Sequence, residues 1–161
     1  MIIRKTEEKD LAEIGEIYSA ARRFMRENGN PNQWRTEYPS ELDAKADMER
    51  GIGYVCEDAG EVVAVFAFGI ENEPTYDKIF DGAWQNDEPY AFIHRVAVKK
   101  HGQGIVDRCF EYCFSVHPNL RIDTHRDNIP MQKVLLRAGF VRSGIIYLKS
   151  GDERIAYHKI K

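Results

Sequence analysis

The sequence predicts a single α/β domain, residues 1–161, in which about seven strands form a mixed sheet packed with four main helices. Two observations lead to this prediction. Runs rich in Val, Ala, Ile and aromatic residues alternate with segments whose apolar residues recur three and four apart, as strands and helices require. The length also suits one ordinary domain, and no internal repeat or low-complexity tract divides the chain.

The N-terminal part of the chain predicts a short strand followed by two helices. Residues 2–3 form the strand, and Thr6 caps the first helix. The apolar stripe of this helix comprises Leu11, Ile14, Ile17, Tyr18, Ala21, Phe24 and Met25. Ser40 and Asp43 have the spacing of a capping box, so a second helix is expected from there to Gly51.

A β-hairpin is expected next, because a glycine turn joins two strand-like runs at 54–56 and 61–69. Residues 71–89 contain prolines and acidic groups around isolated aromatic residues, which predicts a long loop with some local helix. Beyond it we expect helices at 105–116 and 131–138 and strands at 90–98, 120–124, 144–148 and 154–158, the last two forming another hairpin.

The composition argues against several classes of partner. A net charge of -3 and a pI near 6.0, without a basic stripe, speak against nucleic acid and anionic membrane surfaces. No apolar stretch is long enough to span a bilayer and no secretory signal opens the chain, so we expect a cytoplasmic protein. There the cysteines stay reduced, and Cys109 and Cys113, on one helix face, favour core packing over a metal site.

The most informative segment is the passage from a strand into a helix at residues 96–105. Gly102 and Gly104 allow a tight turn that exposes backbone N–H groups. The first turn of the following helix adds unpaired N–H donors at the positive end of its dipole. Such a turn can bind phosphate, although alone it is equally compatible with a purely structural connection.

A second segment makes the interpretation more specific. Asn128 is followed by Met131 three residues later and by the pair Gly139-Phe140. Together with Lys99-x-x-Gly102-x-Gly104, these residues resemble two motifs of the Gcn5-related N-acetyltransferase (GNAT) superfamily: its pyrophosphate loop, Q/R-x-x-G-x-G/A, and its N-x-x-A motif with a later Gly-Phe pair. The resemblance covers nearly the whole chain, since the order of elements is also that of the family, and it is nearest to an uncharacterised bacterial subgroup.

The resemblance implies a three-layer fold whose central sheet is splayed. It also implies an N-acetyltransferase that moves an acetyl group from acetyl-CoA, its cosubstrate, to a primary amine of a small molecule or peptide, without a metal. A homodimer is one possible assembly, because homodimers are common in the family. The residues expected to bind acetyl-CoA are Val96, Val98, Gly102, Gln103, Gly104, Ile105 and Asn128.

Two departures from the family pattern matter. The turn between Val98 and Gly102 is short and lacks the usual proline and arginine, which leaves the docking of the phosphates open. The position seven residues after Asn128, where many members carry a tyrosine that protonates the leaving thiolate, is Leu135. That acid therefore cannot be assigned here.

The chemistry requires a base, because the amine must be neutral to attack and an ammonium has a pKa near ~10. His94 on the strand at 90–98, and Asp123 and His125 at the end of the strand at 120–124, are the candidates. Each could instead be a strand-end group bonded to the backbone. Arg95 could bind an acidic group of the substrate, but an ion pair with Asp123 or Glu88 is the favoured expectation.

The loops at 28–38 and 71–89 are expected to shape the acceptor pocket. Trp34, Trp84 and Tyr90 are candidates for stacking on the substrate, although Trp34 could equally anchor its loop. The sequence does not choose among amino acids, polyamines, peptide N-termini and drug-like amines.

Two other functions stand as alternatives. Because Leu135 removes the familiar acid, the chain could be a catalytically inert sensor or regulatory module that binds acyl-CoA. A dinucleotide-binding fold is disfavoured, because its third glycine would fall at Asp107 and the chain ends in a hairpin rather than in further βαβ units.

Overall fold

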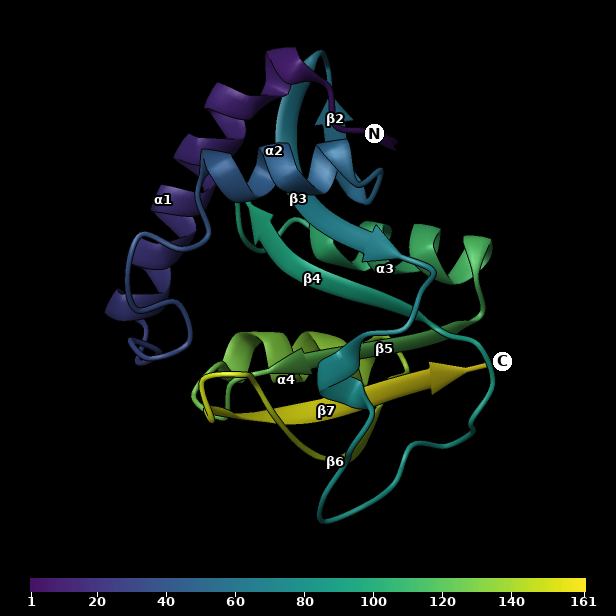
Figure 1. Ribbon diagram of the computed structural model, residues 1–161. Coiled ribbons are helices and arrows are strands. Elements are labelled where there is room, and N and C mark those ends of the chain that lie inside the picture. The colour runs from purple at the N-terminus through teal and green to yellow at the C-terminus, as the bar shows by residue number, and fades with distance from the viewer.

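The computed structural model describes all of residues 1–161 and contains a seven-stranded mixed sheet, with the strand order β1-β2-β3-β4-β5-β7-β6 (Figure 1). The strands are β1 (Ile2–Lys5), β2 (Gly53–Asp58), β3 (Glu61–Gly69), β4 (Ala91–Val98), β5 (Asn119–Thr124), β6 (Val141–Tyr147) and β7 (Glu153–Ile160). The helices are α1 (Leu11–Glu27), α2 (Glu41–Glu49), α3 (Ile105–Val116) and α4 (Ile129–Arg137). The predicted α/β fold class and the order of its strands and helices are confirmed, but Thr6 does not cap the first helix, because a 3-10 turn at Glu8–Asp10 precedes α1 and Asp10 is the N-cap of α1. None of the helices combines the length and apolar character needed to cross a bilayer.

Several strands differ from their predicted bounds by one or two residues at an end, and β6 differs most. β6 begins at Val141 rather than at Gly144, because Val141 and Arg142 already pair with His158 and Tyr157 of β7. The register shifts between Arg142 and Gly144, and this irregularity interrupts the alternation from which the strand was predicted.

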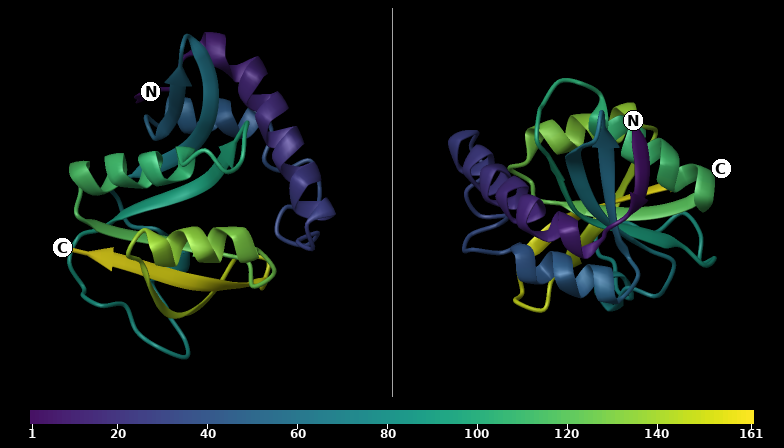
Figure 2. Two further views of the ribbon diagram at one scale, coloured as in Figure 1. Left: turned by 180° about the vertical axis from the view of Figure 1, so that it is seen from behind. Right: turned by 90° about the horizontal axis from the view of Figure 1, so that it is seen from above.

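The helices form two layers, with α1 and α2 on one face of the sheet and α3 and α4 on the other (Figure 2). Ile14 and Tyr18 of α1 pack on Val55 and Val65 of the sheet. On the opposite face a larger apolar cluster joins α3 and α4 to the sheet, and it contains Leu135 and all three cysteines, Cys56, Cys109 and Cys113. The predicted packing role of the two helical cysteines is confirmed.

The strands β4 and β5 run parallel but separate almost at once. They pair only at Ala91 with Leu120 and at Phe92 with Arg121, and beyond these residues each strand follows its own half of the sheet (Figure 1). The sheet is therefore open on the side toward which β4 and β5 run, as the family resemblance implies.

A bulge in β4 lies beside this opening. Ala67 of β3 pairs with His94, and Val65 pairs with Ala97, so β4 carries one more residue than β3 over the same length. Arg95, within the bulge, has a φ of 53°, which is a costly conformation for a residue with a side chain. The bulge changes which way Arg95 faces relative to a regular strand.

The long loop between β3 and β4 is ordered against the sheet. It contains the short 3-10 helix η2 (Pro74–Tyr76), as predicted for this segment. Arg121 of β5 lies between the rings of Trp84 and Tyr90, with its guanidinium carbon 4.3 and 4.1 Å from the two ring centroids. The loop is thereby held over the part of the sheet where β4 and β5 begin to diverge.

His158 of β7 also holds this loop. Its Nδ1 atom accepts a hydrogen bond from the backbone N–H of Gln85 at 3.0 Å, so the Nε2 atom carries the proton and donates to Oδ1 of Asn119 at 2.6 Å. The side chain is fully buried, and burial lowers the pKa of His158 to about 4.

The buried neutral His158 should make the free energy of unfolding depend on pH. The unfolded chain binds a proton at this residue near pH ~6.5, whereas the folded chain does so only near pH 4, so stability is lost as the pH falls. Between pH 7 and 5 His158 should account for a loss on the order of 2 kcal/mol. In urea titrations, the free energy of unfolding of His158→Gln should fall less than that of wild type between pH 7 and 5. The control His117→Gln should show the full wild-type fall. A His158→Gln variant with the full wild-type loss would contradict this account.

Candidate active site

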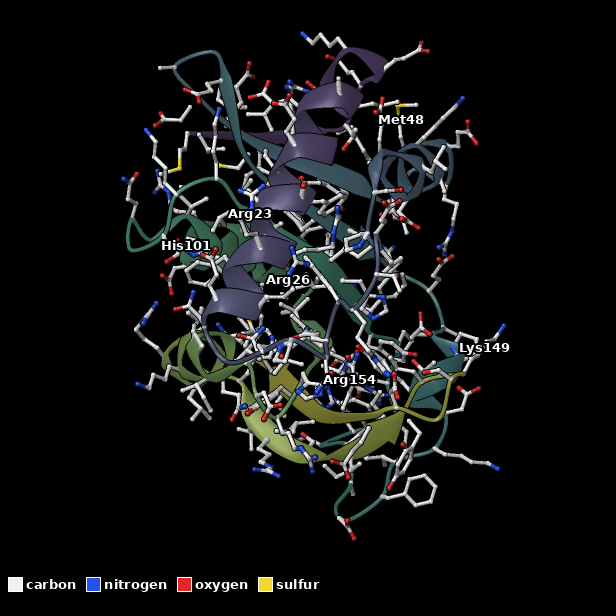
Figure 3. All side chains as sticks on the ribbon, turned by 90° about the vertical axis from the view of Figure 1, so that its left-hand side faces the viewer. Arg23, Arg26, Met48, His101, Lys149 and Arg154 are labelled. Carbon is white, nitrogen blue, oxygen red and sulfur yellow. The ribbon has the colours of Figure 1, made fainter.

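The opening between β4 and β5 contains a cavity of about 510 Å³. Its walls come from β4, β5, the loop between α1 and α2, the start of α4 and the turn between β6 and β7. In Figure 3 Arg154, at the start of β7, lies between the α1–α2 loop and the β6–β7 hairpin, on this side of the molecule. Of the residues predicted for the site, His94, Asp123, Arg95 and Trp34 all line the cavity. The loop at 28–38 contributes to its lining as expected, whereas no residue of the loop at 71–89 does.

Tyr76 connects two of the predicted catalytic residues. Its hydroxyl group donates to Oδ2 of Asp123 at 2.6 Å and lies 3.1 Å from Nε2 of His94. The single proton of the Tyr76 hydroxyl group is donated to Asp123. The hydroxyl oxygen can therefore only accept a hydrogen bond from His94, which places the imidazole proton on Nε2. His94, Tyr76 and Asp123 thus form one chain of hydrogen bonds, to which the 71–89 loop contributes the middle member.

Burial changes the acid–base properties of this chain. It raises the pKa of Asp123 above its usual value, while the hydrogen bond from Tyr76 and the charge of Arg154 act in the opposite direction. Burial also lowers the pKa of His94 to about 4, with the nearby charge of Arg95 adding to this effect, so His94 is neutral near pH 7. The site therefore pairs a carboxylate of increased basicity with a histidine of decreased basicity.

Arg95 does not pair with Asp123 or Glu88, so that expectation is wrong. Its Nε and Nη2 atoms bind Asp47 of α2 at 2.9 and 2.7 Å, and Nη1 donates to the hydroxyl of Tyr38 at 3.1 Å. The bulge in β4 explains the change of partner, because it turns Arg95 toward the face that α2 covers. The ion pair in turn holds Arg95 in its unfavourable backbone conformation.

The α1–α2 loop covers one side of the cavity, and contacts of Gln33 and Trp34 keep this loop in position. Trp34 packs edge-on against Tyr18 of α1 with its side chain mostly buried, so it anchors the loop while part of it faces the cavity. The side-chain oxygen of Gln33 accepts from Nδ2 of Asn128 at 2.9 Å, and its backbone carbonyl accepts from Arg154 at 3.1 Å.

Trp84 and Tyr90 do not line the cavity, which corrects their assignment to the substrate site. Both enclose Arg121, and Trp84 also donates to the carbonyl of Tyr76 at 3.0 Å.

His125 is also absent from the lining of the cavity. Its Nδ1 atom accepts from the backbone N–H of Asp127 at 3.0 Å, so the ring supports the turn before α4. His125 follows β5, which ends at Thr124, so its side chain does not continue the strand alternation that would place it on the same face as Asp123.

The glycine turn before α3 has the predicted geometry. Gly102 and Gly104 have φ values of 74° and 70°, and Gly104 is the N-cap of α3. The backbone N–H groups of Gln103 and Gly104 have no acceptor within the protein. A narrow, mostly apolar cavity of about 110 Å³ lies between this region and the main cavity, and the two share Met25, Val96, Asn128 and Met131.

Asn128 has its side chain engaged within the protein. The Oδ1 atom accepts from the N–H of Met131 at 3.1 Å, which caps α4, while Nδ2 donates to Gln33. The residue also lines both cavities. A contact with a cofactor through Asn128 would therefore have to share or replace its bond to Gln33.

Sequence reasoning did not assign a role to two residues of the site, Tyr76 and Arg154. Tyr76 was placed only in a loop expected to shape the pocket, and its role depends on contacts with distant strands. Arg154 was placed only in a strand, although it shares a strand face with Ala156 and the buried His158, and a charged residue on a buried face is unusual. No group of three or more His, Cys, Asp or Glu side chains is arranged to hold a metal ion.

The comparison with known proteins points to one family. No protein-family model and no curated protein matches the sequence. Among solved structures, a GNAT family acetyltransferase from Streptococcus agalactiae is 29% identical, with a TM-score of 0.91 over 99% of this chain and 95% of that chain.

More distant structures share the fold alone. A ribosomal-protein-alanine N-acetyltransferase from Brucella melitensis is 17% identical, with a TM-score of 0.68 over 100% of both chains. A Salmonella typhimurium protein solved with its cofactor acetyl-CoA is 16% identical, with a TM-score of 0.67 over 99% of this chain and 94% of that chain. The full-length likeness to these acetyltransferases, together with the splayed sheet and the glycine turn before α3, shows that the chain has the GNAT fold.

Proposed function

We propose that the protein transfers the acetyl group of acetyl-CoA to a primary amine of a small molecule. The observation that carries this proposal is a pair of adjoining cavities that extend from His101, beside the glycine turn, to the mostly buried carboxylate of Asp123, with an unpaired edge of β4 along their side. A phosphate-binding turn at one end and a base at the other are what an acyl transfer from a CoA thioester to an amine needs.

The residues of the glycine turn suit a pyrophosphate group. Gln103 and Gly104 present free N–H groups, and the first turn of α3 adds the positive end of its dipole. The backbone of Val96 and Val98 lies on the side of β4 that β5 has left, where an extended chain with amide groups would find hydrogen-bonding partners. When bound, acetyl-CoA supplies the activated acetyl thioester.

Asp123 is the better candidate for the base. Its raised pKa makes the carboxylate a stronger proton acceptor than an ordinary aspartate, and Oδ1 remains available because Tyr76 uses Oδ2. His94, with a pKa of about 4, holds a proton weakly and serves to position Tyr76. Leu135 is compatible with turnover, because a thiol with a pKa near ~8.5 leaves as a thiolate without needing a strong acid.

The glycine turn can be tested by blocking it. Gly104→Glu places a side chain and a negative charge at the N-terminus of α3, so it should abolish acetyl-CoA binding measured by calorimetry. Gly151→Glu is the matched control, since Gly151 has a similar positive φ, 90°, in the turn between β6 and β7. Unchanged affinity in a folded Gly104→Glu protein would remove the turn from the site.

The base can be tested by removing its charge. Asp123→Asn keeps the shape of the side chain and should lower turnover about 100-fold to 10,000-fold at neutral pH, the usual contribution of a general base. Asp127→Asn, which changes a half-exposed carboxylate outside the cavity, should retain wild-type turnover. Thiol release at wild-type rates by Asp123→Asn would exclude Asp123 as the base.

A broad panel of amines tests the alternative function. If the wild-type protein binds acetyl-CoA but turns over no amine of the panel, the result would favour an inert acyl-CoA-binding module.

Tyr76 should set the pH at which the base works. The hydrogen bond from Tyr76 lowers the pKa of Asp123, so its loss in Tyr76→Phe should raise that pKa. Since only the ionised carboxylate accepts a proton, the acidic limb of the kcat/KM profile should move to higher pH by about one unit. Tyr147→Phe, on an exposed tyrosine, should leave the profile in place. An unmoved acidic limb in Tyr76→Phe would separate Tyr76 from the base.

A further inference from the structure

Arg154 is a buried charge without a carboxylate partner. Its residue is 5% exposed, and its two hydrogen bonds go to backbone carbonyls, from Nη1 to Glu153 at 2.9 Å and from Nη2 to Gln33 at 3.1 Å. The other two arginines at the cavity, Arg35 and Arg95, are paired with Asp152 and Asp47. Arg154 forms no ion pair at all, although burying an unpaired charge is costly.

The guanidinium of Arg154 has unused donors, and the residue lines the main cavity. Of its five N–H groups, two are used in the bonds to the carbonyls, and a guanidinium keeps its charge in a protein. Arg121 also lacks a carboxylate partner and donates to the carbonyl of Asn86 at 2.8 Å, but its faces are covered by Trp84 and Tyr90. Arg154 has no aromatic cover and lines the main cavity instead.

The sheet register places Arg154 close to the base. Asp123 of β5 lies opposite Ala156 of β7, so Arg154, two residues away from Ala156, is on the same face of the sheet. Diagonal neighbours of this kind have Cα atoms about 7–8 Å apart, and long side chains span that distance. The charge of Arg154 accordingly acts on Asp123 through the cavity. A carboxylate that accepts a proton and a cation that binds an anion thus stand next to each other.

We infer that the amine acceptor is a free amino acid, whose carboxylate is bound by Arg154 while its amine lies at Asp123. This inference rests on the proposed acetyl transfer and specifies its substrate. An amine and a carboxylate separated by one or a few carbon atoms suit two side chains that are diagonal neighbours on one face of the sheet. A carboxylate also supplies the planar pair of oxygens that matches the fork of a guanidinium and neutralises its buried charge. A polyamine would instead bring further positive charge to Arg154.

The substrate class can be tested with matched pairs of ligands. Each proteinogenic amino acid is compared with its carboxamide as acceptor, using the full-length protein, acetyl-CoA and detection of the released thiol. Rates are expressed per free amine, because the two forms differ in amine pKa. For the amino acids that are accepted, the acid should exceed the amide in kcat/KM by about 10-fold to 100-fold, as expected for a charge-assisted hydrogen bond.

Variants at position 154 test whether Arg154 causes the preference for the acid over the amide. Arg154→Gln should reduce the preference for the acid, measured as the ratio of the two kcat/KM values, to about threefold or less, and Arg154→Lys, which keeps the charge, should restore part of the preference. Arg142→Gln, which removes an exposed arginine from β6, is the matched control and should keep the full preference. Thermal denaturation of each variant verifies that the fold is intact.

Equilibrium binding separates this inference from the proposed activity. Calorimetry with amino acids and amides in the presence of CoA should show the same preference for the acid. In one outcome, the protein binds acids in preference to amides, Arg154→Gln loses this preference, and no amine is turned over. This outcome would support the carboxylate site and contradict the acetyl transfer. Turnover of acids and amides at equal rates, unchanged in Arg154→Gln, would overturn the carboxylate site and leave the acetyl transfer standing.

Discussion

The early separation of β4 from β5 is the constraint on which the rest of the structure depends. Two parallel strands that pair at only two positions leave backbone groups without partners along both inner edges. The chain cannot fill this gap with apolar side chains alone, because N–H and C=O groups line it. The opening is therefore a polar space in the middle of the protein, and it must be either hydrated or occupied by a ligand that supplies the missing hydrogen bonds.

Charged groups around the opening are each stabilised in a different way. Arg95 is paired bidentately with Asp47, Arg121 is enclosed by aromatic rings, and Asp123 accepts from Tyr76. Arg121 and Arg154 both donate only to neutral carbonyls, which position a guanidinium without neutralising it. Arg154 differs from Arg121 in having no aromatic cover and in lining the main cavity. The difference distinguishes charges that support the fold from one whose partner is expected to come from outside.

The sequence predicted most of the fold because helices and strands depend on local periodicity. The glycine turn and Asp123 could be found in the same way, since both occupy defined positions at the ends of predicted strands. The bulge at Arg95 could not be foreseen, because an extra residue appears only when β4 is aligned with β3. The partners Tyr76 and Arg154 were also missed. Each reaches the site through contacts with segments distant in the sequence, and no spacing rule encodes such contacts.

The loop between β3 and β4 links the stability of the fold to the chemistry of the site. Tyr76 can hold Asp123 only while this loop lies against the sheet, and the loop is kept there by Arg121 and His158, neither of which reaches the main cavity. Protonation of His158 would break its bond to Gln85, because the acceptor nitrogen would become a donor. One of the contacts that keep the loop against the sheet would then be lost, and with it part of the support for the hydrogen bond that favours the ionised form of Asp123. A residue remote from the reacting atoms would in this way change the proton affinity of the base.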